Sequence, residues 1–273
     1  MRSSLKVITH VVVAIYAVLA LLPLAWMMMS AFKDNGAISL SPLSLPTSYD
    51  FSVFADAWAV GGIGQYAINS IIVTVVTTTV VLLVSSMAGF ALSRLQFWGS
   101  KYVLTAMVLG LLLPIQAYFI AQNQLFEAVH LKDTRLALIV PYTAIGIPLA
   151  IWLIKTYVDS MPKEMFEAAR IDGASDLSVY RMIMLPVMRP ALVTVGIFTA
   201  LAAWNEFLLA LLYVQDESLK TIPTGLLAFS SRYATDYRML FAALTIVTVP
   251  LVIVYVMFSK QITEGLTQGS VKG

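Results

Sequence analysis

Long stretches without aspartate, glutamate, lysine or arginine constrain the fold of this chain more than any other feature. Crossing the hydrocarbon core of a bilayer, which is about 30 Å thick, takes roughly 20 apolar residues in a helix. Five uncharged runs meet this length: 7–32, 57–93, 102–126, 136–154 and 239–259. A sixth, 190–214, is interrupted only by Glu206. We therefore predict an all-α membrane protein with six transmembrane helices in a single domain, residues 1–273.

The composition agrees with this prediction. Hydrophobic residues make up 59% of the chain and charged residues 12%, whereas soluble domains have roughly 45–50% and 25%. The first run is longer than the apolar core of a secretory signal peptide, which has about 7–15 residues, so we expect an uncleaved helix. With no cysteine, the chain has no disulfide framework and no cysteine-based metal site.

The placement of basic residues predicts the orientation. Six spans put both termini on one side of the membrane, together with the loops 94–101 and 155–189. Eleven of the seventeen lysine and arginine residues fall on that side. Because basic residues are enriched in cytoplasmic loops, we expect cytoplasmic N- and C-termini and a cytoplasmic loop of about 155–189 between the fourth and fifth spans.

This cytoplasmic loop is rich in charged residues but lacks the composition of a flexible linker, so we expect it to fold. Ser160 is the predicted N-cap of a short helix that has Pro162 in its first turn. Gly173 is expected to end this helix in the left-handed conformation. A second helix is expected to begin at Ser175 and to break at Pro186.

The first of these helices is expected to lie across the cytoplasmic face. It would expose Met165, Phe166 and Ala169 as apolar contacts beside Glu167 and Arg170. Such a surface suits a groove on a partner protein. It suits equally an amphipathic helix resting on the membrane interface, and the residues alone leave both interpretations open.

The octapeptide Glu-Ala-Ala-Arg-Ile-Asp-Gly-Ala at 167–174, followed by Leu185-Pro186 and Pro190, resembles the EAA loop of ABC importer membrane subunits. The resemblance implies that the short helix is a coupling helix, inserted in a cleft of a separate ATP-hydrolysing subunit.

The resemblance also implies roles for single residues. Glu167 would pair with a basic group of the ATPase, Ala168 and Ala169 would keep the helix slim, and Gly173 would end it. The residues implied in ATPase coupling are Glu167, Ala168, Ala169, Arg170, Asp172 and Gly173.

Other segments resemble the maltose-permease type of carbohydrate uptake subunit. These are Trp204-Asn205-Glu206-Phe207, Asn69-Ser70, and the tail from Gly265 to Gly273. The resemblance implies a permease subunit of an ATP-driven sugar importer, multi-pass in a prokaryotic cell membrane. The implied partners are a second homologous permease subunit, two ATP-binding subunits, an extracytoplasmic solute-binding protein and a sugar or oligosaccharide.

We expect no cofactor on this chain and no nucleic-acid partner. ATP and Mg²⁺ are expected on the partner subunits, because the sequence has no GxxxxGK[ST] phosphate-binding loop. In the two longer outer loops, aromatic residues including Tyr49, Trp58, Phe229 and Tyr233 are candidates for contact with the solute-binding protein. An interfacial aromatic belt explains several of them equally well.

Glu206 is a candidate for the translocation path, since an ionisable residue inside a span is costly to expose to lipid. Trp204 and Asn205 adjoin it, and an aromatic face beside amide and carboxylate groups suits a sugar. The alternative is that Glu206 is a buried structural group bonded by a neighbouring helix and that Trp204 only packs.

The third span contributes further path candidates, Gln116, Tyr118 and Gln122, near Pro114. A proline there can open the helix where it borders a cavity. The alternative is that these polar residues lie near the outer end of the span and are simply solvated.

Other classes of protein fit less well. A secondary transporter usually carries several intramembrane acids and internal repeats, and here one glutamate stands alone. An enzyme lacks support because the sequence has no HExxH motif and no cysteine nucleophile. An importer subunit for a solute other than a sugar remains an alternative.

Overall fold

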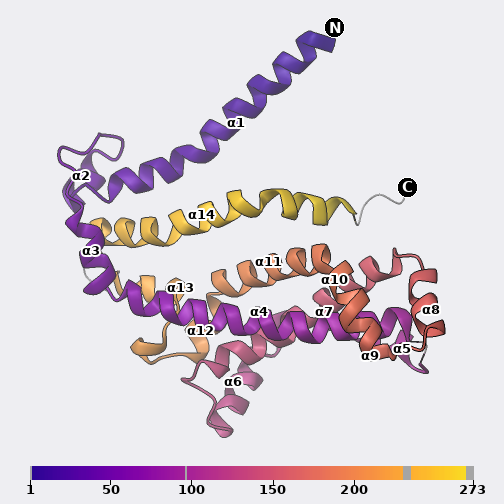
Figure 1. Ribbon diagram of the computed structural model, residues 1–273. Helices are drawn as coiled ribbons and strands as arrows, with labels where there is room; N and C mark the ends of the chain where they lie inside the picture. The colour runs from indigo at the N-terminus through magenta and orange to yellow at the C-terminus, as the bar shows by residue number, and fades with distance from the viewer. Residues whose placement is uncertain (1, 96, 230–234, 269–273) are drawn as a thin grey trace. The chain divides into compact units, whose positions relative to one another are not determined.

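The structure is a computed structural model that describes residues 2–95, 97–229 and 235–268. Every element in these ranges is a helix, which confirms the all-α prediction (Figure 1). The chain divides into two compact units, Met1–Gln65 with Thr224–Val254, and Tyr66–Pro223 with Tyr255–Gly273. The single domain stays a prediction.

The long helices are separated by short ones. In chain order the elements are α1 (Arg2–Ser30), α2 (Asn35–Leu40), α3 (Ser52–Ala59), α4 (Ile63–Arg94), α5 (Ser100–Gly110), η1 (Ile115–Ala117), α6 (Phe119–Ala128), α7 (Leu136–Asp159), α8 (Glu164–Ile171), α9 (Asp176–Val179), η2 (Tyr180–Met184), α10 (Leu185–Val187), α11 (Arg189–Asn205), α12 (Leu208–Tyr213), η3 (Glu217–Leu219), α13 (Ile222–Gly225), η4 (Leu226–Phe229) and α14 (Tyr237–Gln268).

Four helices of the described residues are long and apolar enough to cross a membrane: Lys6–Ser30, Ile63–Arg94, Leu136–Asp159 and Tyr237–Met257. The pair Asp176–Val187 and Arg189–Asn205, bent by 74°, raises the number to five if it is one span. The predicted third span is in pieces, because α5 ends at Gly110 and α6 begins at Phe119. Pro114 lies between them and disfavours helical geometry at the residue before it.

The first unit is joined by polar and aromatic contacts between segments far apart in the sequence. The Trp26 ring meets Phe241 edge-on at 5.2 Å, and its Nε1 donates to Pro42 O at 2.7 Å. Arg238 pairs with Asp50 at 2.7 Å. Over residues 7–22 of α1 the apolar side chains are exposed, as expected for a surface that contacts lipid or another chain.

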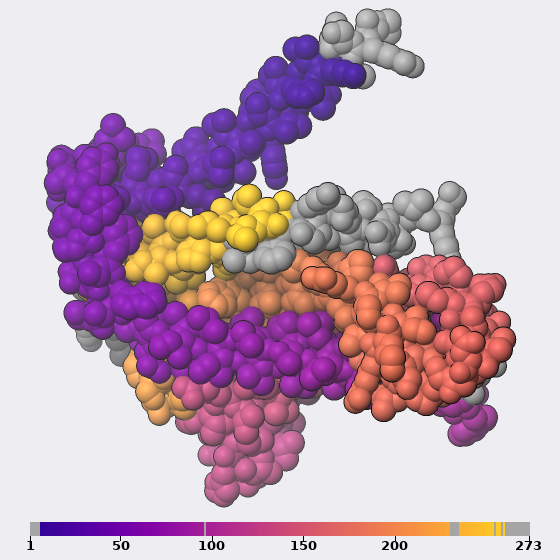
Figure 2. All heavy atoms as spheres, viewed as in Figure 1, coloured from indigo at the N-terminus to yellow at the C-terminus, as the bar shows by residue number. Residues whose placement is uncertain are grey.

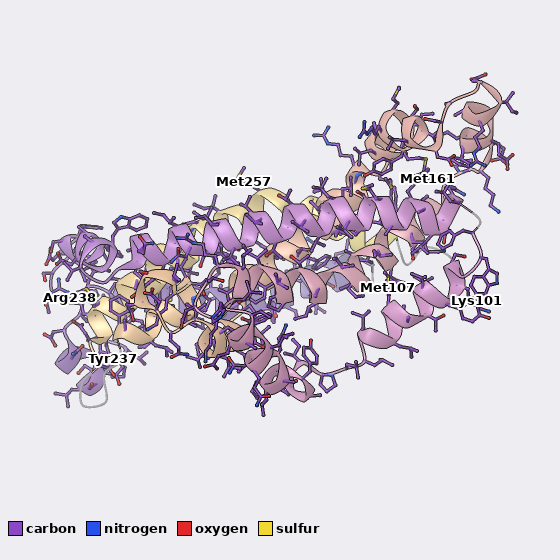
Figure 3. All side chains as sticks on the ribbon, turned by 90° about the horizontal axis from the view of Figure 1, so that it is seen from below. Lys101, Met107, Met161, Tyr237, Arg238 and Met257 are labelled. Carbon is purple, nitrogen blue, oxygen red and sulfur yellow. The ribbon has the colours of Figure 1, made fainter. Side chains whose placement is uncertain are left out.

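The second unit is built around α4 and α7 and has two apolar clusters. One gathers Phe90, Ile154, Phe166, Tyr180 and Met184 from α4, α7, α8 and η2. The other joins α4, α6, α7, α11 and α12. The segment 155–189, red to orange in Figure 2, forms one end of this unit. In Figure 3, Met161 marks the residues just after the end of α7, and Lys101 and Met107 mark α5.

Two predicted helix boundaries in the segment 155–189 are wrong. Ser160 is not the N-cap of α8: it follows the last turn of α7, where its hydroxyl donates to Tyr157 O at 2.6 Å. Pro186 does not break the second helix, because a π-helical turn, η2, directly precedes α10 and the backbone stays helical to Val187. The bend falls at Met188, one residue after Val187.

Candidate functional site

The end of α8 and the turn that follows it have the predicted conformation. Gly173 has a φ of 82°, the left-handed conformation predicted for it. Ser175 caps α9 by accepting the Ser178 N–H at 3.3 Å, and Asp176 lies in the first turn. The turn between α8 and α9 therefore uses the two features that the sequence predicts, the left-handed Gly173 and the Ser175 cap.

The two faces of α8 are not the ones predicted. Phe166 and Ala169 are buried in the apolar cluster, 6% and 8% exposed, and Met165 packs half-buried against it. The prediction that these three form the exposed contact surface is therefore wrong. The reason is that the segment has its own apolar platform, in which the Phe90 ring lies 5.9 Å from Phe166.

The outward face of α8 presents other members of the motif. Ala168, Arg170 and Asp172 are exposed, and Ile171 is 85% exposed. Sequence reasoning did not assign Ile171, although it lies three residues after Ala168 and therefore on the same helical face. The part of this surface formed by Ala168 and Ile171 is apolar and exposed, so it suits the close approach of another protein.

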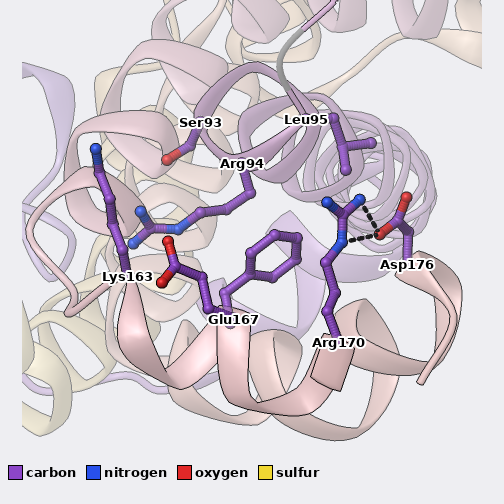
Figure 4. Close-up of a pocket in the computed structure, with 8 residues that line it drawn as sticks. Ser93, Arg94, Leu95, Lys163, Glu167, Arg170 and Asp176 are labelled. Atoms are coloured by element: carbon purple, nitrogen blue, oxygen red, sulfur yellow. Dashed lines mark hydrogen bonds and ion pairs between the residues drawn. The ribbon is translucent and has the colours of Figure 1, made fainter. Parts of the chain in front are cut away.

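Glu167 and Arg170 line a cavity of about 440 Å³ between α8 and the end of α4 (Figure 4). Arg170 pairs with Asp176 at 2.7 Å and lies over the Phe166 ring, 4.8 Å from its centre. The other lining residues are Ser93, Arg94, Leu95, Lys163, Phe166 and Asp176. The cavity thus mixes cations with the motif's glutamate at the surface of the segment.

Glu206 lies at a break in the helix and not within a continuous span. α11 ends at Asn205, and the extended Glu206 backbone is followed by α12. Its Oε1 accepts the Leu209 N–H at 2.9 Å, and its Oε2 accepts the Ala210 N–H at 3.1 Å. The hydroxyl of Tyr142 donates to Oε2 at 2.6 Å. The carboxylate therefore caps α12 and ties it to α7.

The other candidates for the translocation path differ in burial and have no described hydrogen bond to Glu206. The Asn205 amide donates to Leu201 O at 2.8 Å on its own helix and stays exposed, while Trp204 is half-buried. Gln116 is exposed and Tyr118 half-buried. These four residues are not joined to Glu206 by a described hydrogen bond.

Gln122 is linked to α12 from the other side. Its Oε1 accepts the Tyr213 hydroxyl at 2.9 Å, and the Tyr213 ring meets Phe126 edge-on at 5.2 Å. The structure therefore brings Gln122 and Glu206 to the two ends of the same short helix, where both act as structural partners of α12.

A second polar cluster, not assigned by sequence reasoning, fastens the segment 216–222 to α4, and Arg135 at the start of α7 joins it. Asn69 is fully buried, and its Nδ2 donates to Ser218 O and Lys220 O at 2.8 and 2.9 Å. Arg135 donates to Asn69 Oδ1 at 2.9 Å. The Lys220 ammonium and then the Tyr66 hydroxyl lower the pKa of Glu217, which holds it ionised at neutral pH.

The described residues contain no group of three or more histidine, aspartate or glutamate side chains arranged to hold a metal. Phe229, a candidate for the solute-binding protein, is buried and faces Gly61, so that part of the prediction is wrong. Tyr233 and the end of the tail, residues 269–273, lie outside the described residues.

Several apolar helices, spans broken at polar residues, and a charged helical segment mounted on their ends define a multi-pass membrane component of a transport system. The chain belongs to the family of binding-protein-dependent transport system inner membrane components, whose profile matches residues 81–267. It is therefore a multi-pass protein of the cell membrane and not itself an enzyme.

Named relatives agree with this family. The chain is 40% identical to a probable ABC transporter permease, YurM, of Bacillus subtilis, over 95% of this chain and 86% of that one. It is 35% identical to the diacetylchitobiose uptake permease NgcG of Streptomyces coelicolor, over 96% and 88%. It is 34% identical to the trehalose/maltose permease MalG of Thermococcus litoralis, over 94% and 93%.

A solved structure has the same fold. A chain of a bacterial ABC transporter involved in the import of the acidic polysaccharide alginate matches with a TM-score of 0.80, over 94% of this chain and 96% of that one. At 20% identity, this likeness concerns the fold.

Proposed function

We propose that the chain is a permease subunit of an ATP-driven sugar importer. Support for the sugar comes from relatives named for diacetylchitobiose and for trehalose or maltose, and from the segments that resemble carbohydrate uptake subunits. Support for ATP-driven import comes from the family and from the EAA-type motif. The chain works with a second permease, two ATP-binding subunits and an external solute-binding protein.

The observation that carries this proposal is which side chains of α8 are buried and which are exposed. Its apolar stripe is buried in the chain's own core, so the helix is held rigidly. Its opposite face, with Ala168, Ile171 and Asp172, is exposed. If α8 lay on the membrane interface, its apolar stripe would have to face the lipid. The geometry favours insertion into a protein cleft, with Glu167 and Arg170 at its edge.

In this arrangement the segment 155–189 is cytoplasmic and the chain crosses the membrane six times, with the interrupted α5, η1 and α6 as the third span. ATP binding closes the partner ATPases and displaces α8, and the spans change from inward-facing to outward-facing. The ligand thereby biases a two-state element. This chain binds no cofactor, since ATP and Mg²⁺ act on the ATPases.

The proposed path uses the exposed and half-exposed polar groups of the broken spans. Trp204, Asn205, Gln116 and Tyr118 offer an aromatic face and amides for a sugar, and half of them are exposed. Glu206 and Gln122 keep α12 in place beside that path.

The test is purification of the tagged chain from its native membrane in mild detergent, with mass spectrometry of the proteins that accompany it. We expect an ATP-binding protein to be recovered with the wild type and to be lost with Ala168→Arg or Glu167→Lys. Trp98→Arg is the matched control, because Trp98 is 95% exposed and lies outside the segment.

Uptake of labelled diacetylchitobiose, trehalose and maltose by cells with and without the chain tests the sugar. Loss of uptake of an amino acid or phosphate, with sugar uptake intact, would indicate an importer for another solute. Recovery of no ATPase, together with solute transport by the purified chain alone in liposomes, would indicate a secondary transporter.

A further inference from the structure

The Arg94 end of α4 is fastened to the residues that lead into α8. Arg94 Nη2 donates to Val158 O at 2.6 Å and to Met161 O at 2.9 Å. Beside it, Ser93 Oγ donates to Asp159 Oδ1 at 2.5 Å. The guanidinium is buried at the carbonyl end of α7, where the helix dipole favours a cation. Three hydrogen bonds therefore hold α4 to the last turn before the coupling helix.

Close packing supports the same junction. A Cβ placed on Gly89 would lie 2.7 Å from the Ile154 side chain, so only glycine permits α4 and α7 to approach this closely. The Phe90 ring contacts Phe166 of α8 at 5.9 Å and Tyr180 of η2 at 5.6 Å. One end of α4 thus touches the elements before, within and after the coupling helix.

The other end of α4 is fastened to the segment 216–222. The Asn69 amide holds the carbonyls of Ser218 and Lys220, as described above. Ser70 Oγ accepts the Ile222 N–H at 2.9 Å in a buried position. These bonds fix the backbone of the loop that follows α12.

The helix between the two junctions is long and free of proline. Asn69 and Arg94 are about 38 Å apart along α4, at roughly 1.5 Å per residue. Among the four described candidate spans, α4 is the one without proline, since the others contain Pro23, Pro141 and Pro148, or Pro250. Proline is a usual cause of a kink, and α4 has none.

We propose that α4 is a strut that carries motion of α8 to the segment 216–222 at the opposite end of the unit, and that Arg94 and Asn69 are the positioning residues that fasten it. The inference rests on the proposed function. α4 links the ATPase side to the outer side of the path, and α8 and the outer loop move together because both are bonded to one rigid helix.

The first experiment measures sugar transported per ATP hydrolysed, with the native complex carrying the tagged chain purified into proteoliposomes and labelled diacetylchitobiose, trehalose and maltose as probes. Arg94→Met and Asn69→Leu should each lower this ratio about tenfold while ATP hydrolysis continues, the size of a typical coupling effect. Arg94→Lys should restore most of the ratio, because an ammonium also donates to the two carbonyls. Lys101→Met, at an exposed cation of α5, is the control.

The second experiment remains decisive if Arg94→Met fails to assemble. The chain has no cysteine, so Ser93→Cys with Asp159→Cys creates a unique pair that a short bifunctional maleimide can join. If α4 and the end of α7 travel together, the cross-linked complex keeps its transport.

The outcomes separate the two proposals. Cross-linking that stops transport in an assembled complex, or an unchanged transport ratio with Arg94→Met, would overturn the strut. Absence of uptake of every sugar by the wild-type complex would overturn the proposed function and the strut with it.

Discussion

At the residue scale, Glu206 mainly supplies hydrogen-bond acceptors to the backbone. Glu206 accepts two amide hydrogens at the start of α12 and one hydroxyl from α7. A broken helix exposes amides that water cannot reach within a membrane, so an acceptor must be supplied by the protein. The Glu206 carboxylate therefore supplies the acceptors for two backbone amides at the break between α11 and α12.

Replacement of Glu206 separates this structural role from sugar binding. Glu206→Leu removes every acceptor and should lower the free energy of unfolding by roughly 2 kcal/mol, near the upper range for lost caps. Glu206→Gln keeps one oxygen and should be milder, and Tyr142→Phe should remove only the bond to α7. Thermal denaturation in detergent measures the stability, and uptake kinetics measure the KM.

The opposite pattern would contradict this role. If Glu206→Gln raises the KM for sugar while the melting temperature stays at the wild-type value, the carboxylate contacts the substrate and does not merely cap α12.

At the element scale, the sequence predicts which helices exist better than which faces they expose. The left-handed Gly173 and the cap at Ser175 follow from local chemistry and were predictable. The burial of Phe166 was not, because it depends on Phe90, 76 positions earlier in the chain. The same holds for Arg94 and Asn69, whose partners are backbone carbonyls that no sequence motif identifies.

The buried and exposed faces of α8 should respond differently to truncation. Phe166→Ala leaves a cavity in the core and should cost about 3–5 kcal/mol of stability. Ile171→Ala removes an exposed side chain and should change stability by no more than about 0.5 kcal/mol, yet weaken the recovery of the ATPase. Thermal denaturation and co-purification, run on both variants, check the two effects.

The assignment of faces would be wrong if Ile171→Ala lowered the melting temperature as much as Phe166→Ala. It would also be wrong if Phe166→Ala left stability unchanged and released the ATPase.

At the scale of the whole molecule, the number of spans decides the side on which each terminus lies. Among the described residues four helices are long and apolar enough to cross, and the bent pair adds a fifth if it is one span. An odd number would place the termini on opposite sides of the membrane, whereas the distribution of basic residues favours both on the cytoplasmic side. In the six-span arrangement that we propose, the broken segment of α5, η1 and α6 is the sixth crossing.

Labelling with a membrane-impermeant maleimide tests this crossing, since the chain has no cysteine of its own. Trp98→Cys and Val129→Cys stand at exposed positions before α5 and after α6. In intact cells with a permeable outer barrier, Val129→Cys should react and Trp98→Cys should react only after the membrane is opened. Reaction of both from one side would show that the segment re-enters without crossing. The chain would then have five spans, and the orientation inferred from its basic residues would hold for only one of its ends.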